Sequence, residues 1–389
     1  NVDGLEIEFQ LAPDTEAPAE MHLWFPSLRA LCVAENCTGT MHNVLTLRGA
    51  VVRDALQWTR SLDDAMVRYG SELDVLFASH GWPYWGNDDA LTHLRNHRDL
   101  YRWLHDEAMR LANLGHTPDE IADMVQLPPG LWSDWTCHGY YGTVSHNVRA
   151  VYQRYFGFYD GHPSSLNPYP AAESAVRYVE FMGGMETLLA NARRSFEAGD
   201  YRWVAQVLRH AVFTDPTNVE ARNLQADAFE QLGYQAESGP WRDVYLTGAK
   251  ELREGTPRID FPVRPSAASI GGMTPLQVFD YLAVRLNGVE AEKLGHHHLT
   301  WSLSDTGETV HLELSNGTLH SRIAATTSTN VSATIVSTRA DLNRLVGAEL
   351  VFDEAVKSGA VVITGSTELA TSIWNALVTF KMFFAIIEP

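Results

Sequence analysis

A segment rich in proline, glycine and small residues interrupts the chain at residues 253–272, with the sequence REGTPRIDFPVRPSAASIGG. This composition favours neither a regular helix nor a buried strand, so it predicts a linker, which we place at residues 259–272. The 389 residues are also too many for one hydrophobic core, which rarely grows beyond about 250 residues. The sequence therefore predicts a multidomain protein, with its last domain at residues 273–389.

The first 125 residues show the alternation of strands and helices that is typical of an α/β domain. Strands are predicted within residues 5–11, 22–35 and 73–78, and helical segments at residues 52–69 and 88–125. Ligands of α/β domains gather where strands end. Polar side chains that follow these strands are therefore the first candidates for a site.

Residues 126–258 predict an all-helical domain. An aromatic segment at residues 140–159 predicts a helix whose aromatic face fits a buried core or an interface better than a cofactor site. Residues 184–252 resemble tetratricopeptide repeats, with turns at residues 199–200 and 215–216. Two helical pairs are too few for a free solenoid. We therefore expect these helices to pack against a neighbouring element or a second copy of the chain.

Residues 273–389 predict an α+β domain that begins with a helix at Thr274-Pro275, a common helix start. Its strands are predicted near residues 298–304, 309–314, 317–323, 330–337 and 360–365, with helices between and after them. Serine and threonine alternate with apolar residues in these strands. The alternation predicts a sheet with one covered face.

Charge and composition exclude several classes of partner. Acidic residues outnumber basic ones by 48 to 29, for a net charge of -19, so we expect no nucleic acid and no anionic membrane surface as a partner. No apolar run reaches the roughly 18 residues of a transmembrane helix. The three cysteines are too few for a disulfide framework and leave the compartment open. An anionic substrate would need a local positive centre.

Three side chains with metal-binding chemistry lie beside predicted strand ends, namely Glu16, Glu35 and His80. Carboxylate and imidazole groups suit a catalytic metal that keeps one position open for water or substrate. In a chain with 48 acidic residues and 16 histidines, such a trio also arises by chance. The residue types alone therefore also fit an ordinary solvated surface.

The loop from Thr38 to Arg48 adds groups suited to an anion. Asn43 donates two hydrogen bonds, and Arg48 presents a planar fork that matches a tetrahedral oxyanion. His42 exchanges a proton near neutral pH. In the alternative interpretation, Arg48 forms a salt bridge with Asp54 at the start of the next helix, which leaves no room for an anion.

Four stretches in this order resemble the zinc-dependent alkyl sulfatases of the metallo-β-lactamase superfamily: TEAPAEM, AENCTGTMHNVLTLRGAVVRD, FASHGWPYWG and YYGTVSHNVRAVYQRYFGFYDGHPSSLNP. The resemblance runs along essentially the whole chain. It implies a partial α/β metallo-β-lactamase domain at residues 1–125, an all-α dimerisation domain at 126–258, and an α+β sterol-carrier-protein-like domain at 273–389. It also implies a homodimer. In the last domain we expect an apolar cavity capped by the final residues, FFAIIEP.

The resemblance also implies the reaction, which is hydrolysis of alkyl sulfate esters of the dodecyl sulfate type to an alcohol and inorganic sulfate, by water activated between two zinc ions. Its implied zinc ligands are Glu16, Glu35 and His80, with Glu35 bridging the ions. Residues 43–48, including Asn43 and Arg48, are expected to line the sulfate pocket, with His42 as general acid or proton carrier and Tyr152 at the sulfate end. The alkyl chain is expected to lie against aromatic side chains such as Trp82, Tyr84 and Trp85, or in a channel formed with the last domain.

Two departures from the family pattern limit this interpretation. The expected ligand motif H-x-H-x-D-H does not occur in the chain, and GHHHL at residues 295–299 lacks its spacing. Three ligands of an expected seven do not hold a two-metal centre, so we expect the chain to be the C-terminal piece of a longer enzyme. Gly39 and Gly81 also stand where several relatives carry histidine, which puts fine substrate preference in doubt. The alternative is a non-catalytic dimeric protein that binds lipids or alkyl chains.

Overall fold

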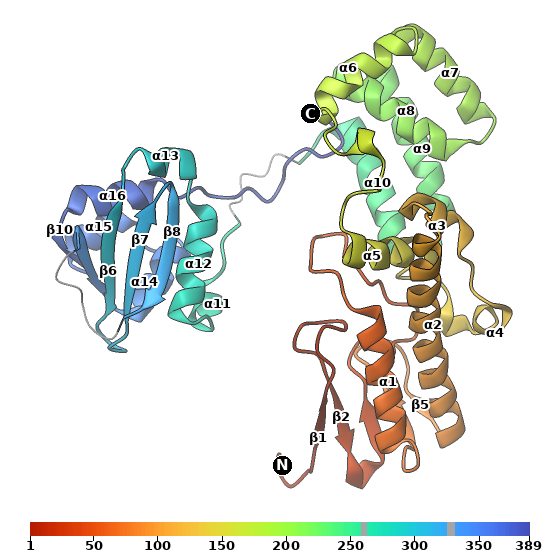
Figure 1. Cartoon of the computed structure of the whole chain (residues 1–389), viewed down its shortest axis with the longest axis horizontal. Helices are drawn as coiled ribbons and strands as arrows, with labels where there is room; N and C mark the ends of the chain where they lie inside the picture. Colours follow the sequence, from red (N-terminus) through yellow and green to blue (C-terminus); the bar gives the residue numbers. More distant parts are fainter. Residues whose placement is uncertain (258–262, 325–330) are drawn as a thin grey trace. The chain divides into compact units, whose positions relative to one another are not determined.

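The structure, a computed structural model, describes residues 1–257, 263–324 and 331–389 (Figure 1). The chain divides into two compact units. The first unit consists of Asn1–Gly255 together with Ala385–Pro389, and the second unit of Thr256–Phe384. Among the described helices, none combines the length and the apolar character that crossing a bilayer requires.

The first unit contains a mixed five-stranded sheet with the order β1-β2-β3-β4-β5. Its strands are β1 (Glu8–Leu11), β2 (Met21–Phe25), β3 (Ala30–Cys32), β4 (Val75–Phe77) and β5 (Tyr84–Trp85). Only β3 and β4 pair in parallel, and helix α1 (Ala55–Tyr69) lies between them in the sequence. The predicted strand, helix and strand of an α/β domain are therefore confirmed.

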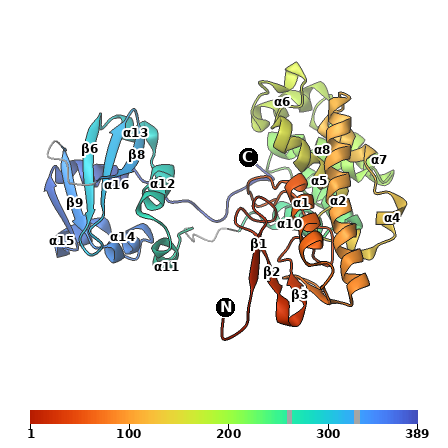
Figure 2. The same cartoon turned by 60° about the horizontal axis from the view of Figure 1, so that its bottom comes forward.

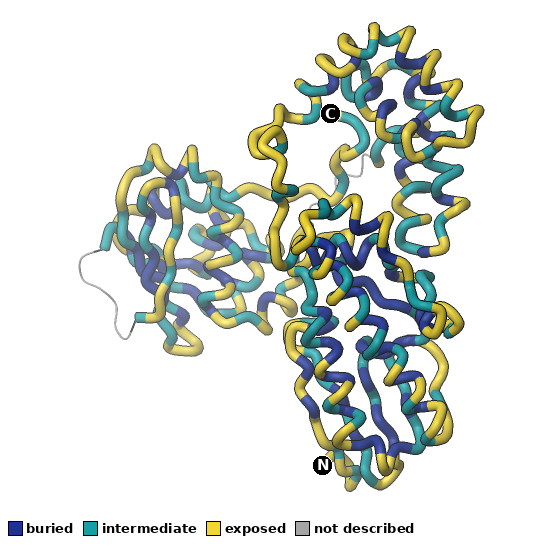
Figure 3. The backbone as a smooth tube through the Cα atoms, turned by 45° about the vertical axis from the view of Figure 1, so that its right-hand side comes forward, coloured by how far each residue is buried: buried dark blue, intermediate teal, exposed yellow. Residues whose placement is uncertain are grey.

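Helices α1 and α2 (Asn87–Asn113) pack side by side (Figure 2), and together with the sheet they contribute to one of the two hydrophobic cores of the first unit. Trp58 of α1 stacks on Tyr101 of α2, with ring centroids 4.5 Å apart. Figure 3 shows buried residues in the interior of the part of the chain near the N-terminus and exposed residues along its outside. This packing holds the loops at the strand ends in place.

The helical pattern predicted over residues 88–125 forms two helices. Helix α2 ends at Asn113, and Gly115 adopts a positive φ of 94° that suits glycine. Helix α3 (Pro118–Met124) then begins with a capping box between Thr117 and Glu120 and with proline in its first turn. The break arises because the turn and cap residues interrupt an otherwise continuous apolar pattern.

The remaining helices of the first unit follow without strands. They are α4 (Pro129–Trp132), α5 (Val144–Phe156), α6 (Ala171–Phe181), α7 (Met185–Glu197), α8 (Tyr201–Thr214), α9 (Val219–Gln235) and α10 (Gly239–Glu254). The turns predicted at residues 199–200 and 215–216 separate α7 from α8 and α8 from α9. The side chain of Asp200 caps α8, and that of Asn218 caps α9. The two predicted helical pairs are confirmed.

The last five residues return to the first unit after the second unit is complete. Ile387 packs against the core formed by α6 to α10, and Glu388 pairs with Arg222 of α9. The prediction that FFAIIEP caps a cavity of the last domain is therefore wrong for residues 385–389. Burial of Ile387 and the ion pair of Glu388 attach this segment to the helical region instead.

The second unit is an α+β domain built on a five-stranded sheet of order β10-β9-β6-β7-β8. The strands are β6 (His297–Leu303), β7 (Thr309–Ser315), β8 (Thr318–Ile323), β9 (Ala333–Ser337) and β10 (Val361–Gly365). The helices are α11 (Ala267–Gly271), α12 (Pro275–Arg285), α13 (Gly288–Glu292), α14 (Arg339–Val346), α15 (Phe352–Ser358) and α16 (Thr367–Asn375). The predicted helix start at Thr274-Pro275 is confirmed by a capping box with Gln277.

The second unit contains a small apolar cavity of about 30 Å³, lined by residues such as Phe279, Trp301 and Trp374. This volume holds about one or two water molecules. It has no room for an alkyl chain. In this conformation the second unit therefore gives no support to the alternative of an alkyl-chain-binding protein.

Candidate functional site

The structure brings two of the predicted metal ligands, Glu16 and Glu35, together with His42 at the strand ends of the first unit. Glu16 follows β1, Glu35 follows β3, and His42 lies in the loop beyond it; their ligand atoms all lie within 4.8 Å of one another. His80, after β4, places Nε2 at 3.3 Å from Oε1 of Glu35. Glu35 therefore faces His80 with one carboxylate oxygen and His42 with the other. The second oxygen, Oε2, lies 3.1 Å from Nε2 of His42.

The protonation of His42 shows that this donor set suits a cation. Nδ1 of His42 lies 2.9 Å from the carbonyl oxygen of Asn43, so Nδ1 carries the proton and donates it. Burial lowers the pKa of His42, which keeps the ring neutral near pH 7. Nε2 then presents a lone pair to the Glu35 carboxylate. These two acceptors repel each other unless a cation lies between them, so the cluster fits either a proton shared at Nε2 or a metal ion held by the carboxylates.

Arg53 is the residue of this cluster that sequence reasoning missed. Its guanidinium pairs with the carboxylate of Glu16. It also donates to Asn43 at two places, the carbonyl oxygen at 2.9 Å and Oδ1 at 2.6 Å. The planar fork of arginine matches such paired acceptors. Arg53 therefore links the loop after β1 to the loop that carries His42, and the only signal for it was its place in the stretch ending GAVVRD.

The loop around His42 is held by side chains more than fifty residues away. Tyr101 of α2 accepts a hydrogen bond from the backbone N–H of His42 at 3.1 Å. Asn147 of α5 donates to the carbonyl oxygen of His42 at 2.9 Å and accepts from Val44 at 2.8 Å. Gly142 passes so close that a Cβ there would lie 2.5 Å from the carbonyl oxygen of His42. Glycine is therefore required at this crossing.

A cavity of about 180 Å³ lies beside this cluster. Its wall includes both predicted anion-binding residues, Asn43 and Arg48. The complete lining is Asn43, Thr46, Leu47, Arg48, Tyr141, His146, Pro240, Trp241 and Val244. The alternative salt bridge from Arg48 to Asp54 is wrong, because Asp54 pairs with Arg154 at 2.9 Å and caps α1. Arg48 is left as an exposed positive charge on the cavity wall.

Comparisons with known proteins point to one family. The family model described as alkyl sulfatase dimerisation matches residues 117–255, and the model described as alkyl sulfatase C-terminal matches residues 264–389. The chain is 41% identical over its whole length to a linear primary-alkylsulfatase of Pseudomonas sp. and 42% identical to an (R)-specific secondary-alkylsulfatase of Pseudomonas sp.. It superposes over its whole length on the stereoselective inverting sec-alkylsulfatase Pisa1 from Pseudomonas sp., with a TM-score of 0.95 and 41% identity.

The chain belongs to the alkyl sulfatase family. It spans 57% and 58% of the length of the two sequence relatives and 61% of the solved Pisa1 chain. The helical region that carries α5 to α10 lies within the match to the dimerisation model. The second unit, from residue 264 onward, lies within the match to the C-terminal model.

Tyr152 occupies a different environment from the other predicted sulfate residues of this alkyl sulfatase chain. It is buried in the core on α5, and its ring packs against that of Phe156 in a tilted arrangement, with centroids 4.7 Å apart. The residues described as lining the cavity do not include it. The tyrosine on the cavity wall is Tyr141, whose ring centroid lies 4.8 Å from that of His42. The position of Tyr152 on α5 directs its side chain into the core. Tyr141, in the loop before α5, lies at the site instead.

The aromatic residues expected to contact an alkyl chain differ in exposure. Trp82 and Trp85 are 91% and 70% exposed, respectively. Tyr84 is partly covered, because its ring stacks on His93 of α2 with centroids 3.9 Å apart. Two of the three predicted side chains are therefore free to meet an apolar group.

A buried hydrogen-bond network supports the loop that carries Glu35. Asn36 donates to Nε2 of His22 at 2.8 Å, and Nδ1 of His22 then donates to Gln10 at 3.3 Å. Protonation of Nε2 would remove the acceptor that Asn36 requires. Burial lowers the pKa of His22 from 6.5 to about 4, although the negative charge of Asp64 acts in the opposite direction and raises it. The neutral ring is therefore part of the folded network.

We expect the first unit to lose stability as the pH falls from about 6.5 to about 4. In this window the unfolded state binds a proton at His22 that the folded state does not, so the free energy of unfolding decreases on acidification. Urea unfolding at pH 7 and pH 5 measures the loss. His22→Gln should show a smaller loss than the unsubstituted chain. Equal losses would contradict a role for His22.

Proposed function

We propose that this chain supplies part of the active site of an enzyme that hydrolyses alkyl sulfate esters to an alcohol and inorganic sulfate. The main support is that Glu16, Glu35 and His42 converge beside a cavity with Arg48 on its wall. The relatives at 41% and 42% identity are named as alkylsulfatases for linear primary and (R)-specific secondary substrates. We assign the sheet and helices of residues 1–125 to a partial metallo-β-lactamase domain, and the second unit to a sterol-carrier-protein-like domain.

In this proposal Glu16, Glu35 and His80 would hold zinc. Zinc supplies positive charge and Lewis acidity at this cluster. The other ligands implied by the family pattern do not occur in this sequence. Arg53 orients the Glu16 carboxylate through its ion pair, since the same guanidinium is held by Asn43.

The sulfate group is placed in the cavity lined by residues 43–48. Arg48 provides the local positive charge that an anion needs near a chain of net charge -19. Asn43 holds the neighbouring wall, and His42 accepts or returns a proton at Nε2, beside Glu35. The alkyl chain extends away from this cluster toward Trp82 and Trp85, whose exposed rings offer apolar surface.

Arg48→Ala in the full-length protein with zinc is expected to lower sulfate release from dodecyl sulfate by about 100-fold, because an electrostatic donor to the reacting anion is lost. Arg60, an exposed arginine of α1, provides the matched control, and Arg60→Ala should retain activity. Equal activity in the Arg48→Ala enzyme and the unsubstituted enzyme would remove Arg48 from the anion site.

We also propose a homodimer formed through the helical region. The match to the dimerisation model covers this region, and it exposes large apolar side chains such as Phe158 and Phe181 at 89% and 94%. Light scattering should give twice the mass of one chain. A monomer whose mass does not change with concentration would contradict this proposal.

A further inference from the structure

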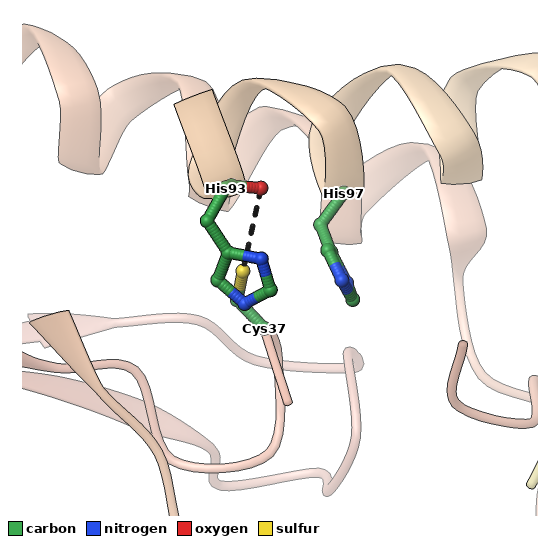
Figure 4. Close-up of side chains that lie close together, drawn as sticks. All are labelled: Cys37, His93 and His97. Carbon is green, nitrogen blue, oxygen red and sulfur yellow. Dashed lines mark hydrogen bonds between the residues drawn. The ribbon is translucent and has the colours of Figure 1, made fainter. Parts of the chain in front are cut away.

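A second cluster with metal-binding chemistry lies in the core of the first unit, and the proposed hydrolytic site does not use it. Cys37 follows β3, and His93 and His97 lie one turn apart on α2, so that both rings reach the same side of the helix (Figure 4). One ligand atom from each of the three residues lies within 4.8 Å of the others. Two histidines separated by three residues are a common metal-ligand spacing.

The histidines of this cluster lack hydrogen-bond partners. His93 is 3% exposed and His97 is fully buried. Within the described part of the chain, all four of their ring nitrogens are buried without a partner. Buried polar groups in folded proteins are nearly always paired, so four orphaned nitrogens in one place require an explanation.

The neighbours of the two rings do not satisfy them. His93 stacks on Tyr84, and its ring meets that of His97 edge to face at 4.5 Å. The carbonyl groups of Cys37 and Thr38 lie near His93, and that of Thr136 near His97, but none reaches hydrogen-bond geometry. Burial lowers the pKa of His93 to about 4 and lowers the pKa of His97 well below its usual value, so both rings are neutral, which is the metal-binding form.

We propose that Cys37, His93 and His97 form a buried site for a soft or borderline transition-metal cation, with Zn²⁺ as the best match, separate from the Glu16 and Glu35 cluster. A thiolate and two imidazoles are preferred zinc ligands. Binding releases the thiol proton of Cys37 to solvent and gives a ring nitrogen of each histidine a partner.

Such an ion would join two elements that position the candidate active site. Cys37 stands two residues after Glu35 and five before His42, whereas both histidines belong to α2. Without a metal, the thiol of Cys37 makes one weak hydrogen bond, to the carbonyl oxygen of His93 at 3.8 Å. The bound cation would therefore anchor the loop of residues 33–43 to α2.

Cobalt(II) tests this site because a cobalt–thiolate bond gives a charge-transfer absorption in the near ultraviolet that oxygen and nitrogen ligands do not produce. The chain should be made in medium supplemented with Co²⁺, since the buried site has to fill as the protein folds. We expect one cobalt ion per chain with the thiolate band. The Glu16, Glu35 and His80 cluster contains no thiol, so failure of the proposed hydrolytic function would leave this signal unchanged.

Variants separate Cys37 from the other cysteines. Cys37→Ser should abolish the band, whereas Cys32→Ser should retain it, because Cys32 lies on β3 outside the cluster. A folded unsubstituted chain that contains cobalt but lacks the band overturns the proposal, as does a band that persists in Cys37→Ser. If Cys37→Ser does not fold, X-ray absorption of the unsubstituted zinc-loaded chain decides. A zinc shell that includes sulfur supports the site, and a shell of oxygen and nitrogen alone overturns it.

Discussion

Replacement of Arg53 by alanine is expected to lower the free energy of unfolding of the first unit by about 3 kcal/mol, the cost of removing one partner from a buried ion pair. The Arg53 side chain is only 10% exposed, and its guanidinium donates to both the carboxylate and the backbone carbonyl oxygen of Glu16. Alanine leaves the Glu16 carboxylate and two acceptors of Asn43 without their donor. Urea unfolding of the chain measures the change.

Two variants control for charge and position. Arg53→Lys keeps the charge but loses the fork, so we expect an intermediate loss of stability. Arg48→Ala removes an exposed arginine five residues away and should change the free energy of unfolding by less than about 0.5 kcal/mol. If Arg53→Ala and Arg48→Ala had equal stability, Arg53 would not be the link between the two loops.

Trp58→Ala is expected to destabilise the first unit by about 3–5 kcal/mol, the usual range for removing a large aromatic side chain from a core. Trp58 is fully buried and stacks on Tyr101. Its indole N–H donates to the carbonyl oxygen of Asn36 at 2.8 Å, next to Glu35. Urea unfolding measures the loss, which we also expect to increase hydrogen exchange in the loop around Glu35.

Two substitutions serve as controls for Trp58. Trp58→Phe retains most of the ring packing and loses the hydrogen bond, so its effect should be smaller than that of alanine. Trp82→Ala removes a tryptophan that is 91% exposed and should leave the free energy of unfolding nearly unchanged. A similar loss in Trp58→Ala and Trp82→Ala would show that the contacts of Trp58 do not stabilise the core.

Local signals in the sequence located most of the elements. Apolar periodicity and capping residues predicted α1, α12 and the helices on either side of residues 199–200 and 215–216. Each of these signals lies within one turn or one strand, so neighbouring residues suffice to specify it. Residues 88–125 were predicted as one helical segment. The structure divides this segment into two helices, because Gly115 and the capping box of Thr117 interrupt it.

The positions of residues beside predicted strand ends also indicated much of the candidate site. Glu16, Glu35 and His80 follow three strands of one sheet, and the structure places Glu35 beside both His80 and His42. Local sequence patterns could not show which of the two arginines in this stretch contacts Glu16. Arg48 and Arg53 stand in the same stretch, yet only Arg53 turns inward to Glu16, because the start of α1 and the partner carboxylate fix its direction.

The sequence by itself determined the alternation of elements, a boundary before the last domain and the set of residues able to bind a cation or an anion. Tertiary structure decided which of these residues meet. Asn147 holds His42 across 105 positions, Tyr152 is withdrawn into the core, Cys37 meets His93 and His97, and residues 385–389 return to the helical region. Such pairings depend on packing between elements distant in the chain, and periodicity or capping carries no information about a partner that far away.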